Sequence, residues 1–148
     1  MLVYRISLTK WADSLAGSGF SARWNPKGVY VIYTAESRAL ACLENLVHRS
    51  GEGLHQNFSL IEISVPDDTA LQTIELNALP DNWHHISGYP VCRAMGREWA
   101  ADHKSLLMRV PSSIIRDEFN ILINPNHPEF KQVKIKRKIP FSFDRRFM

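Results

Sequence analysis

The sequence is poor in the features that mark secreted, membrane-spanning and metal-binding proteins. It has two cysteines, Cys42 and Cys92, and no Cys-x-x-Cys or His-x-x-x-His spacing, so neither a disulfide framework nor a metal site is predicted. The adjacent His84 and His85 are expected to diverge, as neighbours do in a strand or a helix. No apolar run approaches the roughly 20 residues of a membrane-spanning helix, and no signal peptide is recognised. We therefore expect a cytoplasmic protein without a membrane segment.

Several nucleotide-binding and catalytic motifs are also missing. There is no Gly-x-Gly-x-x-Gly and no P-loop, which excludes a Rossmann dinucleotide site and a nucleoside-triphosphatase site of the usual kinds. No Gly-x-Ser-x-Gly motif surrounds Ser112 in Val110-Pro111-Ser112-Ser113, so a hydrolase-type serine nucleophile is not predicted. A loop hydroxyl that orients an arginine, a glutamate or a ligand fits this position better.

Positive charge is concentrated at the end of the chain. The last 18 residues, 131–148, have seven basic side chains and one acid, whereas the other 130 residues have 11 Lys+Arg and 14 Asp+Glu. The basic character is therefore a property of this segment, which weakens a nucleic-acid-binding role for the whole fold. Its alternating lysines favour a sheet edge protected against unwanted pairing. Tracking of nucleic-acid phosphates and docking of an acidic partner remain alternatives.

The hydrophobic pattern predicts one α+β domain over residues 1–148. Helices are expected over 36–49 and 91–103, and the first has an apolar stripe with Cys42 on its inner side. Strands are expected over 3–8, 29–33, 58–65, 73–76, 105–110, 120–123 and 132–139, with a short helical turn over 11–15. The stripe consists of Ala39, Leu40, Leu43, Leu46 and Val47.

The most informative loop is Ser18-Gly19-Phe20-Ser21-Ala22-Arg23-Trp24-Asn25-Pro26-Lys27-Gly28. It holds one arginine, whose planar guanidinium matches a pair of phosphate oxygens, among glycines that let backbone amides approach the same anion. The alternative is a surface salt bridge for Arg23, with Trp24 anchoring the turn in the core.

Two further candidate side chains, Tyr33 and Glu44, follow this loop along the chain. Glu44 lies beside the apolar stripe of the first helix, so it is either solvated or at the floor of a cleft, where it could hydrogen-bond a ribose hydroxyl. Tyr33 ends a strand just before that helix. It is either a half-buried aromatic with its hydroxyl in water or a ring that stacks on a base.

These residues stand in an order that resembles the RES-domain family, named for its arginine, glutamate and serine. The resemblance runs over about residues 3 to 130, with Ser21-Ala22 where the family usually has two glycines. The matching motifs are Tyr4-Arg5, Arg23-Trp24-Asn25-x-x-Gly28, Tyr33-Thr34-Ala35, Ala41-x-x-Glu44, Val110-Pro111-Ser112 and Asn120-x-Leu-x-Asn-Pro-x-His-Pro128.

The resemblance implies a fold similar to ADP-ribosylating toxins, with a mixed, mostly antiparallel sheet and flanking helices. It implies the toxin of a toxin–antitoxin pair that breaks NAD at the nicotinamide–ribose bond and so depletes cellular NAD, with NAD as substrate and no cofactor. Carried over to this chain, the site is Arg23, Tyr33, Glu44 and Ser112, and Trp24 and Asn25 are expected to help bind the dinucleotide.

We expect Glu44 to act on the sugar and Arg23 to bind the diphosphate. Tyr33 is expected to contact the nicotinamide, and Ser112 to hold the geometry of the site. The expected partner is an antitoxin that fuses a helix-turn-helix DNA-binding domain to a domain covering the toxin cleft. The toxin itself is not expected to bind nucleic acid, and a homodimer within the complex is left open. Transfer of ADP-ribose to a protein is one alternative activity, and an RNA-directed toxin using the basic end of the chain is another.

Overall fold

One seven-stranded sheet organises the chain, and the computed structural model describes residues 1–148. The strand order is β4-β5-β6-β2-β1-β3-β7, and all neighbours are antiparallel except β4 and β5, which are parallel. This confirms the expected α+β fold with a mixed, mostly antiparallel sheet. The strands are β1 Leu2–Leu8, β2 Ile32–Ala35, β3 Phe58–Ser64, β4 Leu71–Thr73, β5 Leu107–Pro111, β6 Phe119–Ile123 and β7 Lys134–Phe141. The helices are α1 Arg38–His48 and α2 Tyr89–Asp102.

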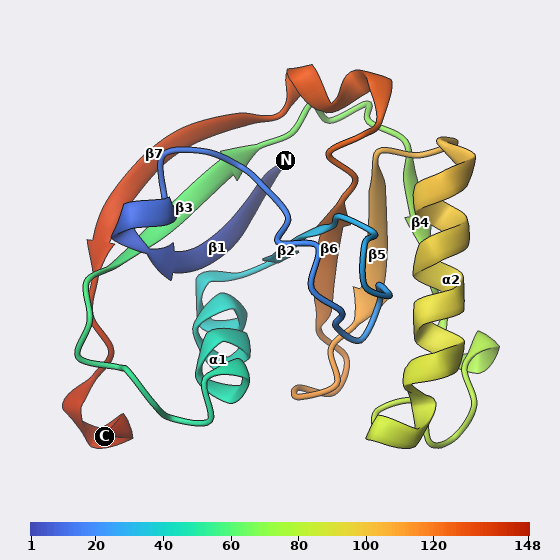
Figure 1. Ribbon diagram of the computed structural model, residues 1–148. Helices are drawn as coiled ribbons and strands as arrows, with labels where there is room; N and C mark the ends of the chain where they lie inside the picture. Colours follow the sequence, from blue (N-terminus) through green and yellow to red (C-terminus); the bar gives the residue numbers. More distant parts are fainter.

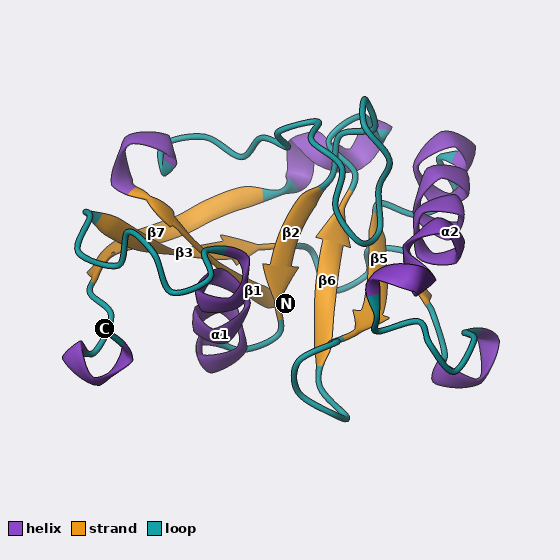
Figure 2. Ribbon diagram, turned by 60° about the horizontal axis from the view of Figure 1, so that its bottom comes forward, coloured by secondary structure: helices purple, strands orange, loops and turns teal.

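Both helices lie on the same face of the sheet, α1 beside β1 and β2 and α2 beside β5 (Figure 1). Alternation along β6 separates the two faces, because Ile121 and Ile123 join one buried cluster while Leu122, between them, joins the cluster under α2. A third cluster joins Leu40 and Ala41 of α1 to the β1 and β3 side of the sheet. The opposite face is covered by loops and short 3-10 turns (Figure 2). Neither helix combines the length and apolar character needed to cross a membrane.

The second strand differs from the predicted range 29–33, because β2 begins only at Ile32. The side-chain amide of Asn25 donates to the carbonyl of Val29, and the Val29 amide donates to the carbonyl of Pro26. These bonds hold Val29 in the turn, so its apolar character does not place it in the sheet. The predicted strand over 73–76 is also displaced. The parallel ladder of β4 with β5 runs from Leu71 to Thr73.

The apolar stripe predicted for the first helix is only partly buried. Leu40 and Ala41 are the buried residues of α1, Cys42 is half-buried, and Val47 is 56% exposed. The helix packs on β1 and β2 through its N-terminal half. Its C-terminal half therefore leaves Val47 at the rim of a cleft that the next subsection describes.

The basic strand β7 lies at one edge of the sheet, as the alternating lysines predict. A bulge interrupts its pairing with β3 between Glu62 and Ile63, and bulges and lysines both discourage pairing with another chain. Arg137 donates to Glu62, a buried carboxylate that also binds Arg38 of α1, and Lys138 pairs with Asp13. Part of the basic charge of this strand is therefore used within the fold.

Candidate active site

A cleft of about 250 Å³ lies on the helix-bearing face, between α1 and the start of α2. Three of the predicted site residues, Arg23, Tyr33 and Glu44, line it together, and Trp24 also reaches its wall. They come from separate parts of the chain: the loop before β2, β2 itself, and α1. The remaining lining residues are Ala22, Val47, His48, Tyr89, Pro111, Ser113, Ile114 and Asn120.

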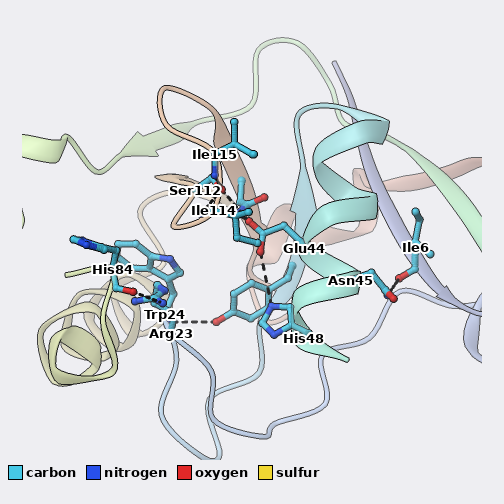
Figure 3. A network of polar contacts seen from close by, with 12 residues as sticks. Ile6, Arg23, Trp24, Glu44, Asn45, His48, His84, Ser112, Ile114 and Ile115 are labelled. Carbon is cyan, nitrogen blue, oxygen red and sulfur yellow. Dashed lines mark hydrogen bonds and ion pairs between the residues drawn. The ribbon is translucent and has the colours of Figure 1, made fainter. Parts of the chain in front are cut away.

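Glu44 extends from α1 toward the loop that follows β5 (Figure 3). Ser37 starts this helix by accepting a hydrogen bond from the amide of Leu40, so Glu44 stands about two turns in, beside the buried side. Its oxygen Oε1 accepts hydrogen bonds from Ser112 Oγ at 3.1 Å and from Asn120 Nδ2 at 2.7 Å. The side chain is 20% exposed, which is the cleft-floor position rather than the solvated one.

Ser112 lies directly behind Glu44, at the end of β5. Its hydroxyl accepts hydrogen bonds from the backbone amides of Ile114 and Ile115, which form the tight turn after the strand (Figure 3). Since two donors already point at this oxygen, its own proton is directed to Glu44. Ser112 does not line the cleft itself, and its hydroxyl donates to the Glu44 carboxylate behind it. A role in orienting that glutamate stays a prediction.

Arg23 has no carboxylate partner, so the surface salt bridge considered for it is not formed. Its guanidinium donates to the backbone carbonyl of Trp83 at 2.6 Å. It also donates to the backbone carbonyl of His84 at 3.1 Å (Figure 3). It also lies 4.7 Å from the centre of the Tyr89 ring. Because a guanidinium has five N–H donors, three remain for a ligand, and its charge is not neutralised by any acid.

A second arginine, Arg93, contacts the ring of the same tyrosine. Its guanidinium is also 4.7 Å from the Tyr89 ring centre, and its Nε donates to the carbonyl of Ala22. Two cations therefore contact one aromatic ring at the start of α2. Arg93 and Tyr89 were not selected from the sequence as site residues. The only signal that they lie side by side is their spacing of four residues on a helix.

Tyr33 and the buried Asn25 form a hydrogen-bonded pair that fixes the arginine loop. The Tyr33 hydroxyl donates to Asn25 Oδ1 at 2.5 Å and accepts from the amide of Trp24. The hydroxyl is thus not in water, and burial raises the pKa of Tyr33 well above its usual range. Its ring still lines the cleft, where stacking on a base remains a prediction.

Trp24 and Asn25, the other expected dinucleotide-binding residues, are both almost fully buried. The side-chain amide of Asn25 donates to the carbonyls of Phe20, Pro26 and Val29. Its side-chain oxygen accepts a hydrogen bond from the Tyr33 hydroxyl. Asn25 thus shapes the loop and does not line the cleft, whereas Trp24 forms part of the cleft wall. Direct binding by either residue stays a prediction.

The serine and alanine that replace the family's usual glycines fit the loop without strain. Neither Ser21 nor Ala22 has a positive φ, whereas Gly19 and Gly28 do, at 75° and 88°. The amide of Gly28 donates to the carbonyl of Gly19 and closes the loop. The positions that need glycine therefore have it.

A second hollow, of about 240 Å³, adjoins the cleft on the β1 side of α1. The two share Tyr33, Glu44, His48 and Asn120, so Glu44 stands where they meet. Together they exceed the roughly 300 Å³ at which small-molecule sites begin. His48, whose Nε2 lies 3.9 Å from Glu44 Oε2, and Asn120 were not selected from the sequence as site residues. Asn120 opens the quoted Asn-x-Leu-x-Asn-Pro motif, but nothing in that motif indicates that its side chain reaches α1.

His84 and His85 do not diverge, contrary to the sequence expectation. Their ring centres lie 4.2 Å apart, because they occupy a turn and not a strand or a helix. No group of three or more His, Cys, Asp and Glu side chains is placed to hold a metal ion. The turn instead provides a carbonyl that binds Arg23.

The RES domain model matches residues 2–144. A "Prs ADP-ribosylating toxin" of Sphingobium sp. (strain YBL2) is 39% identical over 142 residues, which cover 93% of this chain and 88% of that protein. A "Toxin Res" of Yersinia enterocolitica is 32% identical over 151 residues and covers 99% of both chains.

A solved structure gives the same fold. A chain of the M. tuberculosis MbcT–MbcA toxin–antitoxin complex superposes with a TM-score of 0.80 at 19% identity, covering 95% of this chain and 84% of that one. The family match spans almost the whole chain and includes every residue of the cleft described above. The chain belongs to the RES-domain family.

Proposed function

We propose that this protein is the toxin of a toxin–antitoxin pair and that it cleaves NAD at the bond between nicotinamide and ribose. The observation that carries the proposal is the cleft itself, in which an unneutralised arginine, an aromatic ring and a hydrogen-bonded carboxylate come together. These are Arg23, Tyr33 and Glu44. Their chemistry matches, in turn, a diphosphate, a pyridine ring and a sugar that develops positive charge.

The bond cleavage needs charge stabilisation more than proton transfer. When the bond between the ribose C1′ and the nicotinamide nitrogen breaks, the electron pair moves to the nitrogen and removes the positive charge of the ring. Nicotinamide therefore leaves as a neutral molecule without a general acid. The positive charge appears on the sugar as an oxocarbenium-like species, and the Glu44 carboxylate stabilises it.

The sugar is then captured by an acceptor. Water adds through its oxygen and loses a proton, which gives ADP-ribose, whereas phosphate gives the phosphorylated sugar. Hydrolysis and phosphorolysis follow the same first step, so both belong to this proposal. The chemistry of this reaction requires neither a metal ion nor a cofactor, because NAD is itself the substrate.

Transfer of ADP-ribose to a protein is a second candidate. A relative 39% identical to this chain is named a Prs ADP-ribosylating toxin. The first step is again loss of nicotinamide, and only the acceptor differs. A toxin role also predicts a cognate antitoxin with a helix-turn-helix domain that covers the cleft, and the "MbcT–MbcA toxin–antitoxin complex" of the structural neighbour supports such a partner.

One experiment tests the reaction and its acceptor. The purified protein is incubated with NAD labelled in the nicotinamide and, separately, in the adenine, with and without phosphate and with and without cell lysate. Release of free nicotinamide supports the proposal. The adenine label then appears in ADP-ribose, in its phosphorylated form, or on a protein. If NAD stays intact in every arm, even at a protein concentration close to that of NAD, the proposed cleavage is contradicted.

A further inference from the structure

We infer that Asn120 is a positioning residue for Glu44, a role that rests on the proposed NAD cleavage. Asn120 projects from β6, the strand next to β2, and donates from Nδ2 to Glu44 Oε1 at 2.7 Å. This is the shorter of the two bonds that the oxygen accepts, the other coming from Ser112. The sheet and the loop after β5 therefore hold the same carboxylate oxygen.

The two oxygens of Glu44 consequently have different surroundings. Oε1 is anchored by two donors, whereas Oε2 accepts no hydrogen bond and lies 3.9 Å from the His48 ring nitrogen, beyond hydrogen-bonding distance. Glu44 stands where the cleft and the second hollow meet. Oε2 is thus the oxygen left to accept a ribose hydroxyl or to face the charged sugar.

Asn120 holds this position at an energetic disadvantage. Its own oxygen, Oδ1, is buried and has no hydrogen-bond partner, and it is the only such side-chain atom in the protein. Turning the amide over would bring Oδ1 against Glu44 Oε1 and leave Nδ2 buried without an acceptor, so the bond to Glu44 fixes the orientation. A residue kept only for stability would not leave a buried acceptor unpaired.

A matched residue on the same segment shows the contrast. Asn124 follows β6, and its amide donates to the carbonyl of Ala100 while its oxygen accepts from the amide of Asn126. It is fully buried and both of its polar atoms are satisfied. It does not line the cleft or the adjoining hollow. Asn124 is therefore a structural asparagine, and Asn120 is not.

The test compares Asn120→Leu with Asn124→Leu by steady-state nicotinamide release and thermal unfolding. Leucine has a similar shape and removes both the donor and the unpaired acceptor. For Asn120→Leu we expect kcat to fall about 10- to 100-fold, with KM for NAD within about threefold and Tm unchanged or higher. For Asn124→Leu we expect a lower Tm and an unchanged kcat per folded molecule. Asn120→Leu with parental kcat, or with the Asn124→Leu pattern, overturns the inference.

A second measurement separates this inference from the proposed function. Tm is measured for Glu44→Met, which removes the acceptor of the Asn120 hydrogen bond, for Asn120→Leu and for the double variant. Changes in Tm that are not additive show that the two side chains act together whether or not NAD is cleaved. If the parent protein releases no nicotinamide, the proposed function fails. The double-variant cycle then decides by itself whether Asn120 positions Glu44. Additive changes then overturn the positioning role.

Discussion

Ser112 Oγ lies 3.1 Å from Glu44 Oε1 and, because it already accepts from two backbone amides, donates its proton to that carboxylate. The two residues are 68 positions apart, and their contact joins α1 to the loop after β5. Ser112 is thus a hydrogen-bond donor to the acid. The serine and glutamate of the family motif are therefore in direct contact in this fold.

Ser112→Ala should therefore lower activity and stability together. It removes one donor to Glu44 and leaves the amides of Ile114 and Ile115 without their acceptor. We expect nicotinamide release to fall about 10- to 100-fold and unfolding free energy to fall by about 1–3 kcal/mol. The measurements are steady-state kinetics and denaturant unfolding. Ser105→Ala, which removes a buried hydroxyl bonded to Trp99 far from the cleft, is the control. Parental kinetics in Ser112→Ala would exclude a role for the hydroxyl in positioning Glu44.

Glu44→Gln separates charge from shape. The amide oxygen can still accept from Ser112 and Asn120, so the fold should be retained, while the negative charge that stabilises the sugar is lost. We expect kcat for NAD to fall about 10²- to 10³-fold. The check is nicotinamide release with matched circular dichroism. Glu36→Gln, at a surface pair with Arg109, should leave the rate unchanged. If Glu44→Gln consumes NAD at the parental rate, Glu44 is not the catalytic carboxylate.

Arg23→Lys tests the diphosphate contact. An ammonium cannot reproduce the planar fork that binds two carbonyls and still leaves donors for a ligand. We expect KM for NAD to rise at least tenfold, with a smaller change in kcat, because the lost contact is the same in the ground state and the transition state. Arg97→Lys, at an exposed position on α2, is the control. An unchanged KM in Arg23→Lys would place the diphosphate elsewhere.

Much of the fold follows from local patterns. The helix at α1 is predicted by its apolar spacing and by Ser50-Gly51 after it, and β3 by an apolar run that ends before Pro66. The strand over 29–33 was misplaced because Val29 is bound by the side chain of Asn25, a contact that hydrophobicity does not indicate.

Arg23, Tyr33 and Glu44, which were selected from the sequence, line one cleft, but the contacts that hold them there could not be predicted. Glu44 is found from the family motif, but its orientation depends on Ser112 and Asn120, which are 68 and 76 residues away. Arg23 is likewise held by carbonyls about 60 residues away, in the turn at Trp83. Such contacts depend on how β5, β6 and α2 pack against one another, and no local pattern encodes that packing.

Gly96→Ala should separate the arginine loop from α2. A Cβ at position 96 would lie 1.6 Å from the carbonyl oxygen of Trp24, so the backbone of the loop could not stay in place. We expect a loss of about 3 kcal/mol or more, at the upper end for overpacking, and a Tm lower by roughly 6–12 °C. Ala94→Gly, on the exposed side of α2, should cost only about 1 kcal/mol. A Gly96→Ala protein as stable as Ala94→Gly would contradict the close packing.

Tyr33→Phe should change how stability responds to alkaline pH. Burial raises the pKa of the Tyr33 hydroxyl well above the value near 10 of an unfolded tyrosine. Below that value both states keep the proton. Above it the unfolded chain loses the proton while the folded chain retains it, so the unfolded state binds fewer protons and stability falls as pH rises.

Phenylalanine removes this dependence together with the hydrogen bonds to Asn25 and Trp24. At pH 7 we therefore expect Tyr33→Phe to be about 1–3 kcal/mol less stable than the parent, and between pH 9.5 and 11 we expect that difference to shrink. Denaturant unfolding at each pH measures it, with Tyr30→Phe, whose side chain is about half exposed, as the control. A difference that stays constant with pH would mean that the Tyr33 hydroxyl ionises alike in both states, and that its bonds to the loop do not depend on the proton it donates to Asn25.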